Sequence, residues 1–377
     1  MKIKDILEKK EHTVSFEIFP PNKNFSEEKL KDVTAELVQY NPDFISVTYG
    51  AGGKTKSGTI EMASHIKNNL KTEVMTHLTC VGSKKSEINN FLKEVKENNI
   101  DNILALRGDV PVGETEEIYD RGDYKYASEL IFDLRQNEKF SDLSICAAFY
   151  PETHYQNNDL VDLFHLKNKV DSGVDFLVSQ MFFDNDLFVK FRKNAEKLDI
   201  NVPLIAGIMP VTNAKQIKRI IELSKCSVPK KLEKLIEKYG DNPDSMRKAG
   251  IMYASEQIIE LFAYGIKGVH IYTMNKAENA KEIIKNIESE VSNMDNEDDD
   301  VDELFYDAVR IVLEENSASI SLLQRKMKIG YARAGRIIDE MENRMIVSKQ
   351  DGSKPRKILV GFDYLDRLKG ESNEYSK

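Results

Sequence analysis

One carboxylate inside an apolar segment is the first residue whose surroundings suggest chemistry. Glu17 lies within Ser15-Phe16-Glu17-Ile18-Phe19. A carboxyl group flanked in this way is partly desolvated, which favours its protonated form. A protonated carboxyl suits a general acid that works near neutral pH. The alternative is a buried structural partner of a Lys or Arg, and this segment alone leaves both interpretations open.

A second candidate follows the apolar run 103–106. Arg107, Gly108 and Asp109 come directly after it. The glycine allows close backbone approach, and Arg107 and Asp109 then reach the end of the strand together. An ordinary ion pair in a loop is the alternative for these two side chains.

A glycine-rich loop and a helix face suggest a bound phosphate-containing ligand. Thr48, Tyr49 and Ala51 belong to Thr48-Tyr49-Gly50-Ala51-Gly52-Gly53, and such a loop brings backbone N–H groups close to a phosphate or an aromatic ring. Asp162, His165 and Lys169 share one face of an expected helix, which would hold a ribose or pyrophosphate. A solvated helix face is the alternative.

Two glutamines and the histidines complete the candidates. Gln180 and Gln216 can each donate and accept hydrogen bonds, as the edge of a pterin requires. The histidines show no metal-ligand spacing, and no Ser-His-Asp order stands out, so we predict no metal site and no serine hydrolase. The histidines are His12, His65, His77, His154, His165 and His270.

The elements that would position these residues alternate between strands and helices. Alternation of this length indicates parallel βαβ units, and eight such units close naturally into a (β/α)₈ TIM barrel. A doubly wound open sheet is the alternative, weakened because Pro20-Pro21, and no G-x-G-x-x-G, follows the first strand. The expected strands are 13–19, 44–48, 73–80, 102–107, 143–150, 175–179, 202–207 and 268–272. Expected helices include 27–39, 86–98, 159–171, 213–223 and 244–264.

Composition sets the class of protein. The 377 residues are 41% apolar and 31% charged, with a net charge of −9, which argues against the whole chain being a nucleic-acid binder. Cys80, Cys146 and Cys226 are far apart, which fits a reducing cytoplasm. Neither a signal peptide nor a membrane span is expected.

The pattern changes after the expected barrel, residues 1–290. Residues 291–303 contain an acidic run that reads as a solvated linker. Helical patterns at 304–314, 319–327 and 332–343 precede two short strands at 345–348 and 357–360, joined by a turn at 351–353. This order is that of a winged helix, here 304–363 with a tail at 364–377. Between 304 and 369, thirteen Lys or Arg stand against nine Asp or Glu, so this module is basic.

Nine segments in this order resemble the 5,10-methylenetetrahydrofolate reductase family over about residues 1–290. They are SFEIFPP, SVTYGAGG, THLTC, ILALRGD, AAFYPETH, DLFHLKNKVDSG, SQMFFD, GIMPVTNAKQ and HIYTMNKA. The resemblance implies a barrel that binds FAD and uses NADH or NADPH and a folate in ping-pong order, with the hydride chemistry carried by the cofactor.

The resemblance also implies roles for individual residues. Glu17 would be the general acid that protonates N5 of the folate and opens the methylene bridge to an iminium. Asp109 would lie near the flavin and contact the pterin. Gln180 would be shared by nicotinamide and folate, with Gln216 and Lys276 as further folate contacts. Positions matching FAD contacts are Thr48, Tyr49, Ala51, His77, Arg107, Gly108, Asp109, Ala127, Tyr150, His154, Asp162, His165, Asn168 and Lys169.

The match has two departures. Lys276 stands where the family often has Arg, which keeps the charge but loses bidentate geometry. Ile220 stands where some members place an aromatic residue against the ligand. Control by S-adenosylmethionine is not expected, because the long regulatory region of animal enzymes is not part of this sequence.

The C-terminal module resembles the γ domain of FtsK/SpoIIIE-type DNA translocases. The segment 317–342 with DGSKPRKILV carries this resemblance, which implies a winged helix that reads short DNA sequences through its third helix. Arg333 and Arg336 match family positions, whereas Ala332 replaces a frequent Asn and Asp339 a frequent Glu. Basic residues on a recognition helix suit phosphate contacts.

Two hypotheses from different classes follow. The first is a cytoplasmic flavin-dependent reductase that carries a tethered DNA-binding module, and we expect it to be a homo-oligomer. The alternative is a DNA-binding protein in which the barrel serves as a folate or flavin sensor. A winged helix used only for protein contacts would be a third role for the module.

Overall fold

The chain forms two compact units, Met1–Asp295 and Asn296–Lys377. The computed structural model describes residues 1–22, 25–49, 56–111, 113–152, 159–224, 226–292, 304–329, 331–344, 346–348, 356–361 and 364. Side chains at 56, 57, 159, 160, 223, 288–292, 331, 332, 336, 339 and 343 are also left undescribed.

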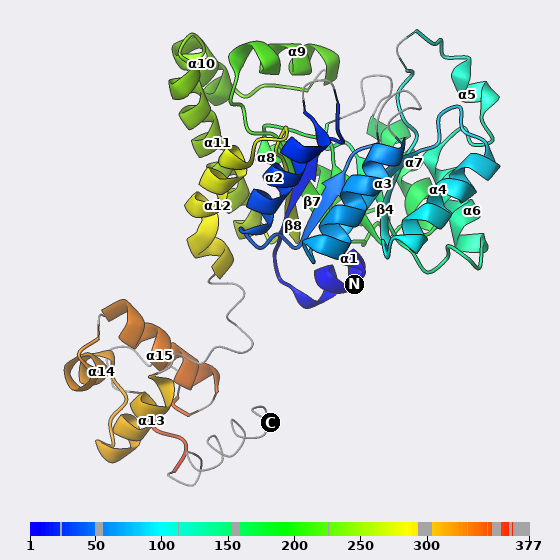
Figure 1. Cartoon of the computed structure of the whole chain (residues 1–377). Helices are drawn as coiled ribbons and strands as arrows, with labels where there is room; N and C mark the ends of the chain where they lie inside the picture. Colours follow the sequence, from blue (N-terminus) through cyan, green and yellow to red (C-terminus); the bar gives the residue numbers. More distant parts are fainter. Residues whose placement is uncertain are drawn as a thin grey trace. The chain divides into compact units, whose positions relative to one another are not determined.

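In the described part of the first unit, eight parallel strands close into a barrel in chain order (Figure 1). The predicted (β/α)₈ barrel is therefore confirmed. The doubly wound alternative is wrong, because β1 pairs with β8 and leaves no open edge. The strands are β1 (Thr13–Ile18), β2 (Phe44–Val47), β3 (Val74–Thr79), β4 (Asn102–Leu106), β5 (Ser144–Phe149), β6 (Phe176–Ser179), β7 (Leu204–Ile208) and β8 (Gly268–Tyr272).

Helices surround the barrel and bury the outer faces of its strands. The main core lies between the two layers and includes Phe16, Ile45, Ile103 and Ile271, all fully buried. The helices of this unit are α1 (Ile3–Lys9), α2 (Glu27–Val38), α3 (Lys56–Ser64) with the π-helical turn η1 (His65–Asn69), α4 (Lys85–Glu97), α5 (Ile118–Arg121), α6 (Ala127–Gln136), α7 (Asp159–Asp171), α8 (Asn185–Glu196), α9 (Ala214–Ser224), α10 (Lys230–Tyr239), α11 (Pro243–Ala263) and α12 (Ala277–Ser292).

Local signals explain where several of these helices begin. The Ser26 side chain accepts a hydrogen bond from Lys29 N at the start of α2, and the Asn242 side chain accepts one from Ser245 N at the start of α11. Both are N-caps that satisfy an otherwise unpaired backbone donor. Pro243 follows as the first residue of α11, where its missing N–H costs nothing.

The strand register brings distant polar residues side by side inside the barrel. Glu17 on β1 is aligned with Ser46 on β2 and with Tyr272 on β8. Ser15, two residues earlier on the same face of β1, is aligned with His270. Closure of the barrel therefore joins the first strand to residues more than 250 positions later in the chain.

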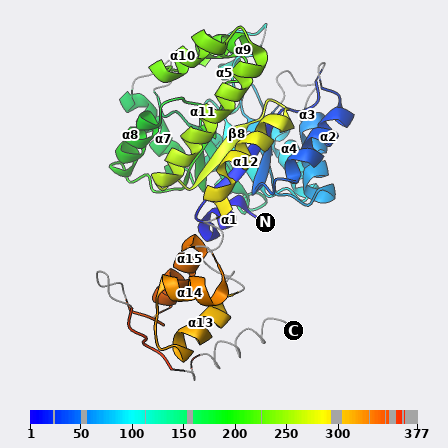
Figure 2. The ribbon, with the colours of Figure 1, turned by 90° about the vertical axis from the view of Figure 1, so that its left-hand side faces the viewer.

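Helix α1 covers the end of the barrel at which the strands begin, and α9 lies at the opposite end (Figures 1 and 2). Ile3 and Leu7 are fully buried against the interior side chains Phe44, Met75 and Leu104. This helix closes the lower end of the barrel to water.

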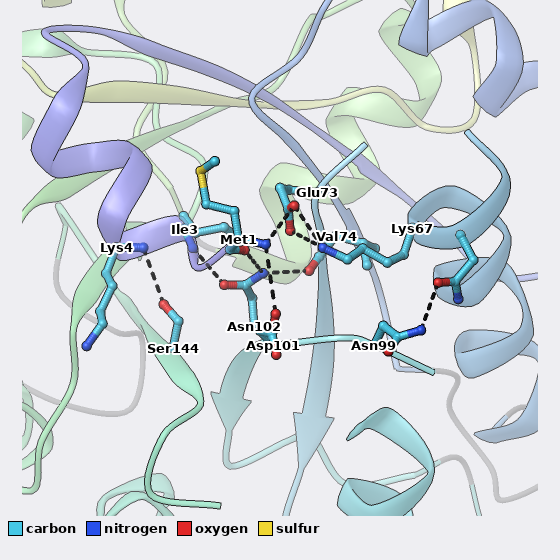
Figure 3. Close-up of polar contacts among 11 residues, drawn as sticks. Met1, Ile3, Lys4, Lys67, Glu73, Val74, Asn99, Asp101, Asn102 and Ser144 are labelled. Atoms are coloured by element: carbon cyan, nitrogen blue, oxygen red, sulfur yellow. Dashed lines mark hydrogen bonds and ion pairs between the residues drawn. The ribbon is translucent and has the colours of Figure 1, made fainter. Parts of the chain in front are cut away.

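Asn102 ties α1 to the strands (Figure 3). Its Oδ1 accepts a hydrogen bond from Ile3 N at 2.7 Å, and its Nδ2 donates to Val74 O at 3.1 Å and to Met1 O at 3.4 Å. Around it, the Met1 amino group donates to Glu73 at 2.8 Å, and Lys67 pairs with the same carboxylate at 2.7 Å.

The second unit has a core of its own. Phe305, Val309, Leu323, Ile338 and Met341 are buried within it. Antiparallel bridges link Ala318 to Arg356 and Val347 to Ile358, while the predicted turn at 351–353 lies outside the described residues. Its helices are α13 (Phe305–Glu314), α14 (Ile320–Met327) and α15 (Tyr331–Asn343), close to the predicted ones.

We predict that Asn102→Ala destabilises the protein by roughly 3 kcal/mol, because it leaves a buried N–H and a buried carbonyl without their partner. Denaturant unfolding followed by circular dichroism measures this loss. The matched control is Asn90→Ala on the exposed face of α4, which should stay within about 0.5 kcal/mol of the wild type. Equal stability of the two variants would contradict a fastening role for Asn102.

Candidate active site at the carboxyl ends of the barrel strands

Glu17 is held in a buried polar sector of the barrel interior. Its side chain is 13% exposed, and its Oε2 lies 3.5 Å from His77 Nε2 and 3.8 Å from His270 Nε2. Burial raises the pKa of Glu17 from its usual 4.5 to about 8. Burial also lowers the pKa of each of the two histidines to about 3. The three groups are therefore neutral near pH 7, and Glu17 carries a proton that it can donate.

Arg107 and Gly108 follow β4 beneath the segment that contains α5. The guanidinium lies 3.6 Å from the ring centre of Tyr119 and 5.3 Å from that of Tyr126, and Tyr119 donates a hydrogen bond to Gly108 O. Gly108 has φ +88, and a Cβ there would come within 2.8 Å of Val81. Only glycine fits this backbone. Asp109, the next residue, is exposed.

Helix α7 brings a half-buried cation to the same end of the barrel. Lys169 Nζ donates to Ala148 O at 2.5 Å, and burial lowers the pKa of Lys169 to about 8, while the charge of Asp162 opposes the shift. His165 stacks on Tyr126 with ring centres 5.5 Å apart. Asn168, one turn before the end of α7, accepts a hydrogen bond from Ser172 through its backbone carbonyl.

The ends of β2, β5 and α6 supply the remaining predicted cofactor positions. Thr48 follows β2, and its carbonyl accepts a hydrogen bond from the Thr59 hydroxyl. Tyr49 packs edge-on against Phe91.

Tyr150 follows β5, and Ala127 is the buried first residue of α6. Ala51 and His154 lie outside the described residues.

The predicted folate contacts come from the last three strand ends. Gln180 is exposed after β6, and its Oε1 accepts a hydrogen bond from Met181 N. Gln216 is half-buried on α9, and Lys276 is exposed just before α12. Glu17, His77, Arg107, Gln180 and Lys276 thus stand at or just beyond the carboxyl ends of their strands, which is the working face of such barrels.

The sequence did not reveal the loop that fixes the end of β1. The Thr273 hydroxyl donates to Glu17 O at 2.6 Å. The Asn275 amide accepts from Phe19 N at 2.8 Å and donates to Phe19 O at 3.3 Å. Met274 and Asn275 both have positive φ, 54 and 57. Residues other than glycine rarely adopt this conformation, and no local sequence signal indicated it.

Two serines and His270 are also part of the site, although the sequence interpretation gave none of them a role. The Ser15 hydroxyl lies 2.8 Å from His270 Nδ1, and the Ser46 hydroxyl lies 2.9 Å from His270 Nε2. Strand alternation places Ser15 on the same side as Glu17. The positions of Ser46 and His270 could be found only from the pairing register of the strands.

Comparison with known proteins assigns this barrel to a family. A family model described as methylenetetrahydrofolate reductase matches residues 2–288. The chain belongs to the methylenetetrahydrofolate reductase family. A second family model, described as the Ftsk gamma domain, matches residues 299–361.

Individual relatives agree with this assignment. A reductase of this family from Arabidopsis thaliana, named methylenetetrahydrofolate reductase (NADH) 1, is 36% identical over 76% of this chain and 50% of its own length. The 5,10-methylenetetrahydrofolate reductase of Escherichia coli is 33% identical over 70% of this chain and 87% of its own length. The chain therefore spans about half the length of the plant relatives and most of the bacterial one.

A solved structure shares the fold. An uncharacterised protein from Clostridium thermocellum, described as binding two copies of 5-methyl-5,6,7,8-tetrahydrofolic acid, aligns with a TM-score of 0.55 at 15% identity. The alignment covers 78% of this chain and 100% of that one. Among the described residues of the present chain, no helix is long and apolar enough to cross a membrane.

We predict that Glu17→Gln stabilises the protein more at pH 8 than at pH 5. The raised pKa means that folding takes up a proton between pH 4.5 and about 8, so the stability of the wild type falls as the pH rises through this window. The variant lacks this titration, and its relative stability should grow by roughly 2–4 kcal/mol from pH 5 to pH 8.

Denaturant unfolding at the two pH values measures the effect. The control is Glu116→Gln, at an exposed position before α5. If Glu17→Gln and Glu116→Gln showed the same pH dependence, Glu17 would not be the buried acid described above.

Proposed function

We propose that this protein reduces 5,10-methylenetetrahydrofolate to 5-methyltetrahydrofolate with a nicotinamide as the reductant. The observation that carries the proposal is the protonated, buried Glu17 carboxyl at the mouth of a barrel that belongs to this family. Reduction of the methylene bridge needs a proton on N5 of the folate before hydride can reach the exocyclic carbon. A carboxyl that is still protonated near neutral pH can supply that proton.

The residues at the mouth fit an FAD cofactor. Lys169 is a half-buried cation on α7, suited to a pyrophosphate. Gly108 fixes the course of the backbone beside Arg107, because a Cβ there would clash with Val81 and Thr79. Arg107 Nε and His77 Nε2 are buried, and neither has a hydrogen-bond partner among the described residues. Donors left without a partner in a buried site are expected to bind a ligand.

We infer a ping-pong order in which nicotinamide and folate use the same face in turn. FAD, when bound, supplies the redox step by accepting hydride from the nicotinamide and passing it to the folate. The protein orients the pterin through Asp109, Gln180 and Gln216, and Lys276 binds the folate from the loop after β8. Glu17 donates the proton to N5. We propose NADH as the reductant, because the plant relatives are named as NADH enzymes.

We predict that Glu17→Gln keeps reduction of the flavin by NADH and loses its reoxidation by methylenetetrahydrofolate, by about 100-fold or more, because only the second step needs the acid. Anaerobic stopped-flow absorbance separates the two half-reactions. Glu116→Gln is again the control and should leave both unchanged. Retention of both half-reactions in Glu17→Gln would show that another group is the acid. A protein that takes up no flavin from added FAD would refute the proposed function.

A second function, DNA binding, is supported by the C-terminal unit. Its match to the Ftsk gamma domain and the excess of Lys and Arg over residues 304–369 favour contact with phosphates. Its three helices followed by paired extended segments agree with a winged helix. Arg333 is a half-buried residue of α15, the helix that would enter the major groove. Arg336 lies on the same helix, but its side chain is outside the described residues.

We predict that replacing Arg333 and Arg336 together by Ala weakens DNA binding at least tenfold. The slope of log affinity against log salt concentration should also become smaller in magnitude by about one to two. Fluorescence anisotropy with a labelled duplex at several salt concentrations measures both quantities. Arg310→Ala is the control, because this arginine is exposed on α13 and pairs with Asp307. Unchanged affinity in the double variant would favour a protein-contact role for the unit.

We further propose a cytoplasmic homo-oligomer. The three cysteines are free thiols, two of them buried, which suits a reducing compartment. Phe132 on α6 and Phe164 on α7 are 57% and 63% exposed. Large apolar side chains this exposed are typical of surfaces that pack against another subunit.

A further inference from the structure

The hydroxyl groups around Glu17 are arranged so that none of their protons reaches its carboxyl. The neighbours that face Glu17 come from all the strands packed around it: Ser46 on β2, His77 on β3, and His270 and Tyr272 on β8. None of these groups carries a positive charge near neutral pH. Within the described part of the chain, no side chain donates a hydrogen bond to the Glu17 carboxyl.

The direction of each hydrogen bond follows from counting donors. The Ser15 hydroxyl donates its one proton to Val269 O at 3.0 Å, so its contact with His270 Nδ1 requires that the ring donates from Nδ1–H. A neutral imidazole has one N–H. His270 Nε2 is therefore an acceptor, and the Ser46 hydroxyl donates to it at 2.9 Å.

The third hydroxyl follows the same rule. Tyr272 donates to Ser179 O at 2.7 Å. The backbone carbonyls of Val269 and Ser179 and the ring of His270 thus take up the protons of Ser15, Tyr272 and Ser46. Of these acceptors, only His270 is a side chain, and the proton that it takes belongs to the direct cross-strand neighbour of Glu17.

We propose that His270 is a positioning residue that keeps the Glu17 carboxyl in its protonated form by accepting the hydroxyl proton of Ser46. Ser46 is the cross-strand neighbour of Glu17 on β2. A hydroxyl proton released from His270 would be available to the Glu17 carboxylate and would stabilise its charged form. Two ring contacts hold His270 in place: Phe44 stacks at 5.6 Å, and Tyr272 packs edge-on at 5.8 Å. The value of this arrangement to catalysis rests on the proposed role of Glu17 as the acid.

The test is an infrared titration of the purified protein. The carboxylic C=O band that is present in the wild type and missing in Glu17→Gln reports the protonation of Glu17 without any turnover. In the wild type its midpoint should lie near pH 8. In His270→Phe, which keeps a ring between Phe44 and Tyr272 and frees the Ser46 hydroxyl, the midpoint should fall by about one pH unit or more.

Two further variants make the test specific. Adding Ser46→Ala to His270→Phe removes the freed donor and should return the midpoint to within a few tenths of the wild-type value. His270→Gln, whose amide oxygen can accept the same proton, should leave it unchanged. A midpoint that stays high in His270→Phe would overturn the proposal, and so would a low midpoint that persists in the double variant.

Ser46→Ala alone keeps the proposal testable if His270→Phe fails to fold. Because the Ser46 proton is already bound to His270, this variant should not move the midpoint, whereas a rise would show that Ser46 donates to Glu17. The pH above which the folate half-reaction loses rate should shift together with the infrared midpoint. If the infrared results hold but Glu17→Gln still reduces folate, the role of Glu17 as the acid fails and this inference stands. If they hold but the wild type reduces no folate, the proposed function fails and this inference stands.

Discussion

Closure of the barrel by pairing of β1 with β8 is the constraint on which the candidate site depends. Glu17 lies near the start of the chain, and its neighbours Tyr272 and His270 lie more than 250 residues later. Without this pairing, β1 would be an edge strand and its carboxyl would meet water. Closure removes the water, and loss of hydration is the cause of the raised pKa. The loop after β8 then fastens the end of β1 through Thr273 and Asn275.

Burying an acid near pH 7 lowers the stability of the folded barrel, and packing elsewhere in the barrel must offset this loss. Two neutral histidines and a carboxyl replace the aliphatic side chains that usually fill such a barrel. The interior at the α1 end is apolar, and Leu104, Cys146 and Ile205 belong to the same buried cluster as Ile3 and Leu7 of α1. Asn102 holds α1 in place, so water is excluded from below as well. Apolar packing is concentrated at the α1 end of the barrel interior, which leaves the carboxyl ends of the strands for polar chemistry.

The sequence predicted the elements better than it predicted the interactions between them. Eight apolar runs gave strands within one or two residues of the observed ones, because each run is buried on both faces. Glu17 stood out because a carboxylate interrupts such a run. The contact of Ser46 with His270 depends on strand register and on tautomer, and neither is encoded locally. Arg107 stacking on Tyr119 joins a strand end to a segment without periodicity. Resemblance to a family implied roles for individual site residues, and no single motif would have supported those roles alone.

The distribution of charge makes the proposed DNA binding compatible with a chain whose net charge is −9. At physiological salt the field of a surface charge decays within about 8 Å, so a ligand responds to the charges near it and not to the total. The excess of Lys and Arg lies in residues 304–369 of the second unit, which has its own core around Phe305 and Ile338. The groups that face Glu17 come from three strands of the first unit, β2, β3 and β8. The proposed folate reduction and the proposed DNA binding therefore draw on separate sets of residues, and loss of either one need not remove the other.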